Sequence, residues 1–326
     1  LFGCSLIYAA VGTLNFNSLS LLLLIPIEIE SLRYLLLSGL FLVTITLLFK
    51  VSAVPFHFWS PDVYEGAPLA TTIIFSITPK ISIFSFFIKW LSILGINFFE
   101  LNNFLMIIGL LSVLVGSLFA IRQKRLKRLV IYSSIAQVGF IIIALSNLHL
   151  NSFISIYFFI FIYLLSSVLV WKQLTIFYSF NSYSSNFFSK SITPLFISSL
   201  SNFYKANPAW AITFVIIFFS IAGIPPLTGF LSKLLILLSL VESNKLISAL
   251  ILVLISAVSV FYYLRIIKIV FFESKNEIKS NKEFQIVFKN NFFYIDCLLI
   301  SVCLFCLFFF FFFPFFFFLK FFYFFI

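Results

Sequence analysis

Apolar runs of about twenty residues recur along this chain, which has 326 residues, 63% of them hydrophobic and 10% charged. A helix needs about twenty apolar residues to cross a bilayer. Strands of a transmembrane barrel alternate apolar and polar residues, whereas these runs do not alternate. The sequence therefore predicts an all-α polytopic membrane protein, with residues 1–326 forming a single transmembrane helical domain.

Hydropathy predicts a partial first span and eight full spans. The partial span covers residues 1–12, and the full spans cover about residues 34–54, 69–94, 101–121, 129–147, 152–175, 208–239, 246–270 and 292–322. Residues 55–68, between the first two full spans, are punctuated by prolines and predict a re-entrant segment. Near the C-terminus we expect a basic loop at residues 273–291 and a Phe-rich helix at residues 292–326.

Basic residues concentrate on one predicted face of the membrane. By parity, the loops near residues 122–128, 172–207 and 265–291 share a face and hold fourteen lysines and arginines, against four on the opposite face. This asymmetry follows the positive-inside rule, so in a mitochondrion the basic face would be the matrix side. The net charge of +11 thus reflects orientation in a membrane and indicates no nucleic-acid partner.

Three lysines lie inside otherwise uncharged apolar stretches, each within a few residues of a proline. Lys50 stands in VTITLLFKVSAVP, Lys80 in SITPKISIF and Lys233 in AGIPPLTGFLSK. An ionisable side chain at membrane depth is costly and marks a functional site by default. Because the pKa of lysine shifts readily on burial, the three positions predict a path for protons or ions. The alternative is that each ammonium reaches the interface along its flexible stem.

Four prolines predict helix breaks, namely Pro55, Pro79, Pro225 and Pro226. Proline lacks the backbone donor of a helical ladder and clashes with the carbonyl four residues earlier. The breaks around Pro55 and Pro225–Pro226 fall in different halves of the chain, and each has a lysine nearby. Paired interrupted helices are typical of inverted repeats whose sites lie near the membrane midplane.

The re-entrant segment also carries titratable side chains. His57 can relay protons near neutral pH or serve as a hydrogen-bonded structural histidine. Asp62 and Glu65 can hold a proton relay or simply cap the segment. These alternatives stay open at this point.

The four cysteines lie in apolar runs and lack metal-ligand spacing with a histidine, so we expect buried free thiols. The sequence shows no nucleotide-binding loop and no cluster-binding cysteines. We therefore expect no cofactor or metal to be bound by this chain.

Five motifs resemble the subunit 2 family of mitochondrial NADH:ubiquinone oxidoreductase (complex I), which is one of its antiporter-like families. The motifs are LFGCSLIYAAVGTLNF, FKVSAVPFHFWSPDVYEGAP, SITPKISIF, RQKRLKRLVIYSSIAQVGF and SIAGIPPLTGFLSK. They keep the family's order from residue 1 to about residue 235. The resemblance implies an antiporter-like fold of fourteen helices with discontinuous members, of which this chain resembles helices 6–14.

The resemblance also implies roles for individual residues. Lys50, Lys80 and Lys233 match the family's lysines in helices 7, 8 and 12, which are taken as members of a proton-transferring hydrophilic axis. Gln137 stands where many relatives have His. An amide does not titrate, so Gln137 is not expected to carry a proton itself. It can take part in a relay by hydrogen-bonding water, or it can be structural.

The implied function is a proton-translocating subunit of NADH:ubiquinone reductase, multi-pass in the mitochondrial inner membrane. In that setting NADH, FMN, iron–sulfur clusters and ubiquinone lie in other subunits. Two alternatives are a free-standing cation/proton antiporter component and a non-pumping structural subunit of the membrane arm.

The family's helix 5 glutamate, which pairs with the lysine at the Lys50 position, would lie before residue 1. The resemblance also implies other membrane-arm subunits and lipids as partners. Because of the position of this glutamate, we expect one partner to be a separate chain that supplies the N-terminal helices and an intramembrane Glu.

Overall fold

The computed structural model describes residues 1–23, 29–94, 99–147, 150–184, 196–201, 203–273 and 291–312. Within these ranges the chain is helical apart from its turns and one isolated bridge between Arg125 and Phe196. The expected fold class, an all-α membrane protein with discontinuous helices, is confirmed.

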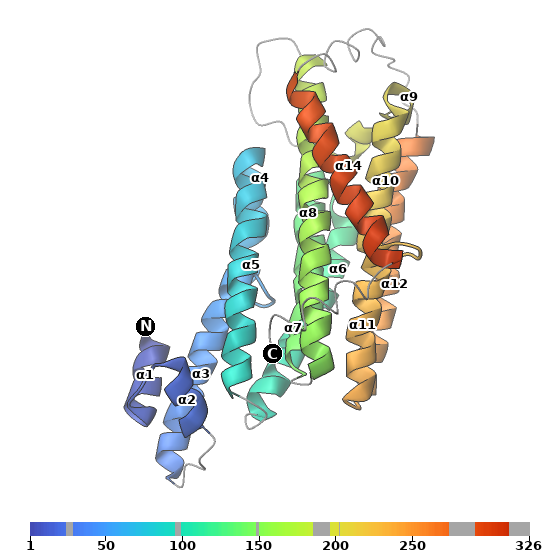
Figure 1. Cartoon of the computed structure of the whole chain (residues 1–326). Coiled ribbons are helices and arrows are strands. Elements are labelled where there is room, and N and C mark those ends of the chain that lie inside the picture. Colours follow the sequence, from blue (N-terminus) through green and yellow to red (C-terminus); the bar gives the residue numbers. More distant parts are fainter. Residues whose placement is uncertain are drawn as a thin grey trace.

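The helices run mostly along the long axis of the molecule, and α14 crosses obliquely over α8 and α10 (Figure 1). Six described helices are long and apolar enough to cross a membrane, and a seventh span results if the bent pair α1 and α2 counts as one. In chain order the helices are α1 (Phe2–Val11), α2 (Phe16–Leu22), α3 (Glu30–Val51), α4 (Trp59–Gly66), α5 (Leu69–Leu94), α6 (Phe99–Arg122), α7 (Leu126–Leu145), α8 (Leu150–Ser184), the short 3-10 turn η1 (Ile197–Leu200), α9 (Phe203–Ala206), α10 (Pro208–Ala222), α11 (Thr228–Glu242), α12 (Leu246–Phe272) and α14 (Asn291–Phe312).

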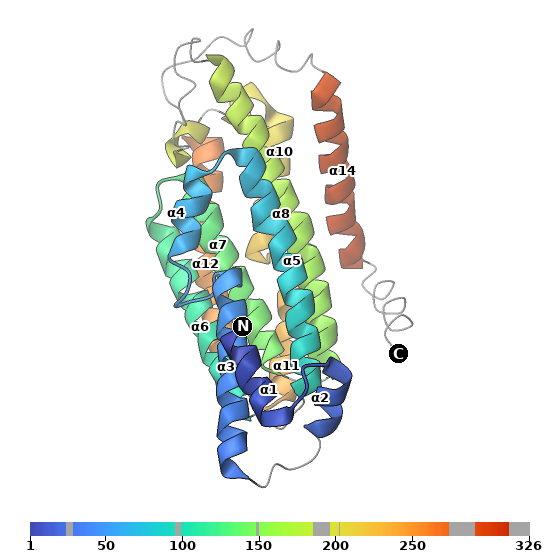
Figure 2. The ribbon, with the colours of Figure 1, turned by 90° about the vertical axis from the view of Figure 1, so that its left-hand side faces the viewer.

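Helix α2 lies between the partial span predicted for residues 1–12 and the span predicted from about residue 34, where no helix was predicted. It follows α1 at an angle of 51°, and both lie beside α3 and α5 (Figure 2). Its first residue, Phe16, contacts the rings of Phe86 and Trp90 on α5, and Leu19 is 4% exposed. Packing against α5 thus stabilises a helix that is too short to persist alone.

Two further boundaries differ from the predicted spans. Helix α8 continues to Ser184, beyond the expected end near residue 175, because Phe177 is buried against Phe203 and Trp210 and keeps the helix in the core. Helix α14 covers the first part of the predicted span 292–322. The rest of the Phe-rich helix predicted for 292–326, and most of the basic loop predicted for 273–291, lie outside the described residues.

The four cysteines form no disulfide within the described residues, and the expectation that all of them are buried is wrong. Cys4 and Cys297 are exposed, because they lie on helix faces that this chain leaves uncovered.

The helical ladder is interrupted around Pro55 and around Pro225–Pro226. Helix α3 ends at Val51 and α4 begins at Trp59, while α10 ends at Ala222 and α11 begins at Thr228. Ser52 (φ 62°) and Gly223 (φ 82°) adopt the left-handed conformation that closes a helix at its C-terminus. At the second break the chain is closely packed, since a Cβ on Gly229 would overlap the backbone of Ser220.

The expectation of a break at Pro79 is wrong, because α5 continues through this residue. Pro79 cannot donate to the carbonyl of Phe75, four residues earlier. The hydroxyl of Tyr64 on α4 donates to that carbonyl instead, at 3.2 Å. The lost bond is thus replaced from another helix, which the local sequence does not show.

Helix α7 forms the centre of the bundle. Of its apolar window 78% is buried, against 33–50% in the other spans. Its contact with α6 is close because Gly116 faces the backbone, and a Cβ there would lie 2.7 Å from the Ala136 nitrogen. Small residues let membrane helices approach in this way.

Charged side chains clamp α4 to the start of α7. Arg125 Nη1 lies 2.5 Å from Glu65 Oε1, and Arg128 pairs with both Glu65 and Asp62, the latter at 2.7 Å. Lys127 Nζ adds a hydrogen bond to the Ala67 carbonyl at 3.2 Å. Glu65 therefore joins two arginines, and the clamp holds the segment after the first helix break against the bundle.

Replacing Glu65 with Gln should destabilise the protein by about 1.5–3 kcal/mol, because hydrogen bonds to charged groups contribute that much and both arginines lose their shared carboxylate. The Glu65 side chain is only 15% exposed. Thermal unfolding of the purified full-length protein in detergent measures the effect.

Asp62→Asn is the matched control. The Asp62 side chain is 74% exposed, and exposed ion pairs contribute about 0–1 kcal/mol. Equal loss of stability in the two variants would contradict the dominance of Glu65 in the clamp.

Candidate functional site

Lys80 is a lysine of α5 enclosed by α7 and α8. Its side chain is 3% exposed, and Nζ donates to Tyr163 Oη at 2.7 Å and to Ser134 Oγ at 3.2 Å. The same nitrogen lies 5.3 Å from the centre of the Tyr163 ring, a distance suited to a cation–π contact. The described hydrogen-bond partners of Lys80 are thus neutral oxygens, which solvate an ammonium without an opposing charge.

Lys233 is held by the second helix break. Its Nζ donates to the carbonyl of Ala222 at 2.7 Å and lies 5.5 Å from the centre of the Phe140 ring. In a continuous helix that carbonyl would accept from residue 226, which is a proline and has no amide. The break therefore supplies the acceptor, at the C-terminal and partly negative end of α10.

The neighbouring Gly223 fits the same arrangement. A Cβ there would lie 2.9 Å from Cδ of Lys233, so the lysine stem packs directly on the glycine backbone. The glycine is thus required both by its left-handed φ of 82° and by the close approach of the lysine.

Two small cavities, each of about 20 Å³, lie beside Lys233 or beside the hydrogen-bond partners of Lys80. A cavity of this size admits about one water if polar groups line it. The first is lined by Ser134 and Tyr163, the partners of Lys80, and the second by Lys233 itself. Four residues line both cavities: Gln137, Tyr163, Ser166 and Ile221.

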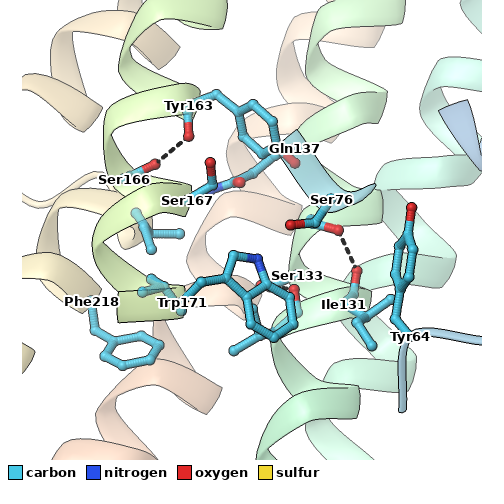
Figure 3. Close-up of a pocket in the computed structure, with 14 residues that line it drawn as sticks. Tyr64, Ser76, Ile131, Ser133, Gln137, Tyr163, Ser166, Ser167, Trp171 and Phe218 are labelled. Atoms are coloured by element: carbon cyan, nitrogen blue, oxygen red, sulfur yellow. Dashed lines mark hydrogen bonds between the residues drawn. The ribbon is translucent and has the colours of Figure 1, made fainter. Parts of the chain in front are cut away.

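Figure 3 shows the first cavity, with Gln137 next to Tyr163 and Ser166 and with Tyr64 at the far side. Tyr64 belongs to α4 and Gln137 to α7, whereas Tyr163 and Ser166 belong to α8. The cavity therefore lies where the segment after the first break meets the central helix.

Tyr163 and Ser134 are site residues that the sequence reasoning missed. They lie 83 and 54 residues from Lys80 in the chain. The signal in the sequence was weak: Tyr163 is a hydroxyl-bearing residue in an apolar run, followed by Ser166 and Ser167. Serines in membrane helices commonly bond only their own backbone, as both of these do.

Lys50 is not brought to these cavities. It is exposed at the end of α3, on an open groove of about 540 Å³ formed with α1 and α5. The groove is lined mainly by apolar side chains, and the described residues that line it include no carboxylate. The structure therefore separates Lys50 from the pair Lys80 and Lys233.

His57 lies in the first break, whereas Asp62 and Glu65 lie on α4, and none of the three lines the two cavities. His57 is 5% exposed, and desolvation by burial lowers the pKa of its imidazole. Asp62 and Glu65 are engaged by arginines in the clamp, which favours a structural role for both.

Within the described residues no group of three or more His, Cys, Asp or Glu side chains has the arrangement of a metal site. The chemistry that the site supports is the holding and passing of protons between amine, hydroxyl and amide groups and single waters.

Comparison with known proteins identifies the family. The family model described as "NADH:quinone oxidoreductase/Mrp antiporter, TM" matches residues 1–261. NADH-quinone oxidoreductase subunit N of Pelagibacter ubique is 34% identical over 278 residues, which are 85% of this chain and 56% of that protein. NADH-ubiquinone oxidoreductase chain 2 of Arabidopsis thaliana is 36% identical over 278 residues, 84% of this chain and 52% of that protein. The chain thus spans little more than half the length of these curated relatives.

Solved structures show the same fold. A chain of respiratory complex I from Thermus thermophilus with bound aureothin has a TM-score of 0.67 and 27% identity, covering 93% of this chain and 62% of that one. A chain of the archaeal membrane-bound sulfane sulfur reductase has a TM-score of 0.74 at 24% identity, covering 93% and 58%. At this identity, the likeness to the sulfane sulfur reductase chain shows a shared fold alone. The family model covers most of the sequence, and this chain therefore belongs to the NADH:quinone oxidoreductase/Mrp antiporter transmembrane family.

Proposed function

We propose that this chain is a proton-translocating, antiporter-like subunit of the membrane arm of respiratory complex I. The observation that carries the proposal is the pair Lys80 and Lys233, each with neutral partners and each beside a cavity whose lining includes Gln137 and Tyr163. A buried amine and a partly buried one, with hydroxyl and amide groups and room for single waters beside them, would form a path along which a proton can move.

The hydrogen bonds suggest how the path is connected. Lys80 donates to the oxygen of Tyr163 at 2.7 Å. The hydroxyl hydrogen of Tyr163 is then available to a water in the cavity beside Lys233, and Gln137 can donate to and accept from the same water. A proton leaving Lys80 would thus pass through Tyr163 or around it before reaching Lys233.

The setting of this path follows from the relatives, which are named as subunits of NADH-quinone and NADH-ubiquinone oxidoreductases. We propose that the chain lies in the mitochondrial inner membrane with its basic end at the matrix. Proton transfer is then coupled to NADH:ubiquinone electron transfer. NADH, FMN, the iron–sulfur clusters and ubiquinone are held by other subunits.

A free-standing cation/proton antiporter is the second candidate, since the family description also covers Mrp antiporters. The names of the bacterial and plant relatives favour the oxidoreductase. Co-purification separates the two: the chain should be recovered with NADH dehydrogenase activity, whereas recovery without that activity favours the antiporter.

Lys80→Ala should lower proton pumping, and with it coupled NADH oxidation, without preventing assembly. Lys80→Arg should also impair pumping, because a guanidinium keeps its proton in proteins. Proton uptake by vesicles and the NADH oxidation rate measure the effect.

Lys89→Arg is the matched control for Lys80→Arg. Lys89 belongs to the same helix and is exposed, so the same substitution should leave pumping unchanged. Normal pumping by Lys80→Arg would show that titration of Lys80 is not required, and normal pumping by Lys80→Ala as well would favour a non-pumping structural subunit.

We further propose that Lys50 is a third relay lysine and that its acidic partner comes from a separate apolar polypeptide of the membrane arm. The groove beside Lys50 is open and mainly apolar, and its described lining includes no carboxylate. A carboxylate within about 4–6 Å of the ammonium would favour its charged form. That polypeptide would cover the groove between α1, α3 and α5.

A photo-crosslinking residue placed at Thr46, which lines the groove, should label a polypeptide that carries an intramembrane Glu or Asp. The same probe at Phe305 of α14, which is 67% exposed, is the control for contact with bulk lipid. Replacing the acidic residue of the labelled segment with its amide should reproduce the pumping defect of Lys50→Ala. Lipid as the only product at Thr46 would contradict the proposal and favour a scaffolding role for this half of the chain.

A further inference from the structure

The basic run of residues 122–128 is divided by the fold into two groups. Arg125, Lys127 and Arg128 turn toward α4 and are engaged by Glu65, Asp62 and the Ala67 carbonyl. Arg122 and Lys124 are exposed, and neither belongs to an ion pair among the described residues. The second group is thus not required to hold α4.

Two further cations join the exposed group from a distant part of the chain. Arg265 of α12 donates from Nη1 to the carbonyl of Ile121 at 3.0 Å, which places it beside the end of α6. That bond uses one of the five donors of its guanidinium. Lys268 follows one turn later and is also exposed. We define Arg122, Lys124, Arg265 and Lys268 as the α6–α12 basic patch.

The carboxylates in the described part of this end do not neutralise the patch. Asp62 and Glu65 belong to the clamp, and Glu273 is exposed at the end of α12. The described residues form no ion pair with any member of the patch. Four cations near one another raise each other's energy, and an anion that contacts several of them offsets this cost.

Each of three patch residues lies one helical turn from an exposed apolar side chain. Leu118 precedes Arg122, Phe261 precedes Arg265 and Leu264 precedes Lys268, and these apolar side chains are 54%, 61% and 44% exposed. Residues four apart share a helix face. The surface is therefore cationic at the membrane boundary and apolar immediately below it, which matches a molecule with an anionic head and acyl chains.

We propose that the α6–α12 basic patch binds the headgroup phosphate of an anionic phospholipid, with the acyl chains along the exposed faces of α6 and α12. Basic sites between membrane helices at the positive end are suited to such headgroups. Arg122 and Lys268 contact the phosphate, while Arg265 is also fixed by the Ile121 carbonyl and sets the separation of the two helices. This binding site does not depend on proton transfer through Lys80 and Lys233.

The test uses the full chain in phosphatidylcholine nanodiscs, into which phosphatidylglycerol is titrated. The readouts are the thermal unfolding temperature and the lipid retained on mild detergent extraction. The unfolding temperature of the wild type should rise with added phosphatidylglycerol, and the wild type should retain this lipid on extraction. The double variant Arg122→Gln with Lys268→Gln should need roughly tenfold or more phosphatidylglycerol for the same gain, since each basic residue near a membrane surface contributes to such binding.

The control double variant is Lys89→Gln with Lys205→Gln, which also removes two exposed cationic side chains. It should respond as wild type does. If the patch variant unfolds early in phosphatidylcholine alone, each single substitution is titrated separately, and each should weaken the response.

Three results would overturn the proposal. One is an equal gain from phosphatidylcholine and phosphatidylglycerol. Another is an equal loss of response in the patch and control variants. The third is full protection by inorganic phosphate in the absence of anionic lipid, which would indicate an anion site without specificity for lipid.

Discussion

The structure depends on how two backbone carbonyls freed by prolines find new donors at membrane depth. Hydrocarbon offers no donor, so a free carbonyl persists only if protein or enclosed water satisfies it. Pro226 leaves the carbonyl of Ala222 without its helical partner, and Lys233 takes that place at 2.7 Å. Pro79 does the same to Phe75, whose carbonyl accepts from Tyr64 at 3.2 Å. One of these donors is a titratable amine and the other is a hydroxyl.

These two replacements also tie the site to the fold. Tyr64 stabilises α5 beside Lys80 and lines the first cavity, so the segment after the first break shapes the surroundings of a lysine on the next helix. The clamp on the flanking Asp62 and Glu65 fixes that segment against α7. Helix α4 thus contacts both the charged end of the molecule and the polar interior.

Composition and periodicity sufficed for the membrane class and for the positions of most spans, because burial in lipid imposes one pattern on every crossing helix. The interruptions near Pro55 and Pro225–Pro226 were also predictable, since several helix-breaking residues act there together. The continuous helix at Pro79 was not predictable from the sequence. The hydroxyl that replaces the missing amide donor belongs to Tyr64, which lies on another helix and 11 residues from the accepting carbonyl. The partners of Lys80 were equally inaccessible to sequence reasoning, since their separation along the chain is 54 and 83 residues. Helix α2 depends on contacts with Phe86 and Trp90, which no local propensity encodes.

The size of the two cavities has a consequence for what can pass between the lysines. Each has about 20 Å³, room for about one water. A proton can cross such a space by exchange along hydrogen bonds, without any heavy atom being carried through. A hydrated metal cation carries several waters with it, and a space for about one water does not admit that shell. Passage of such an ion would require the lining hydroxyl and amide oxygens to replace its waters, whereas a proton needs only an unbroken series of hydrogen bonds.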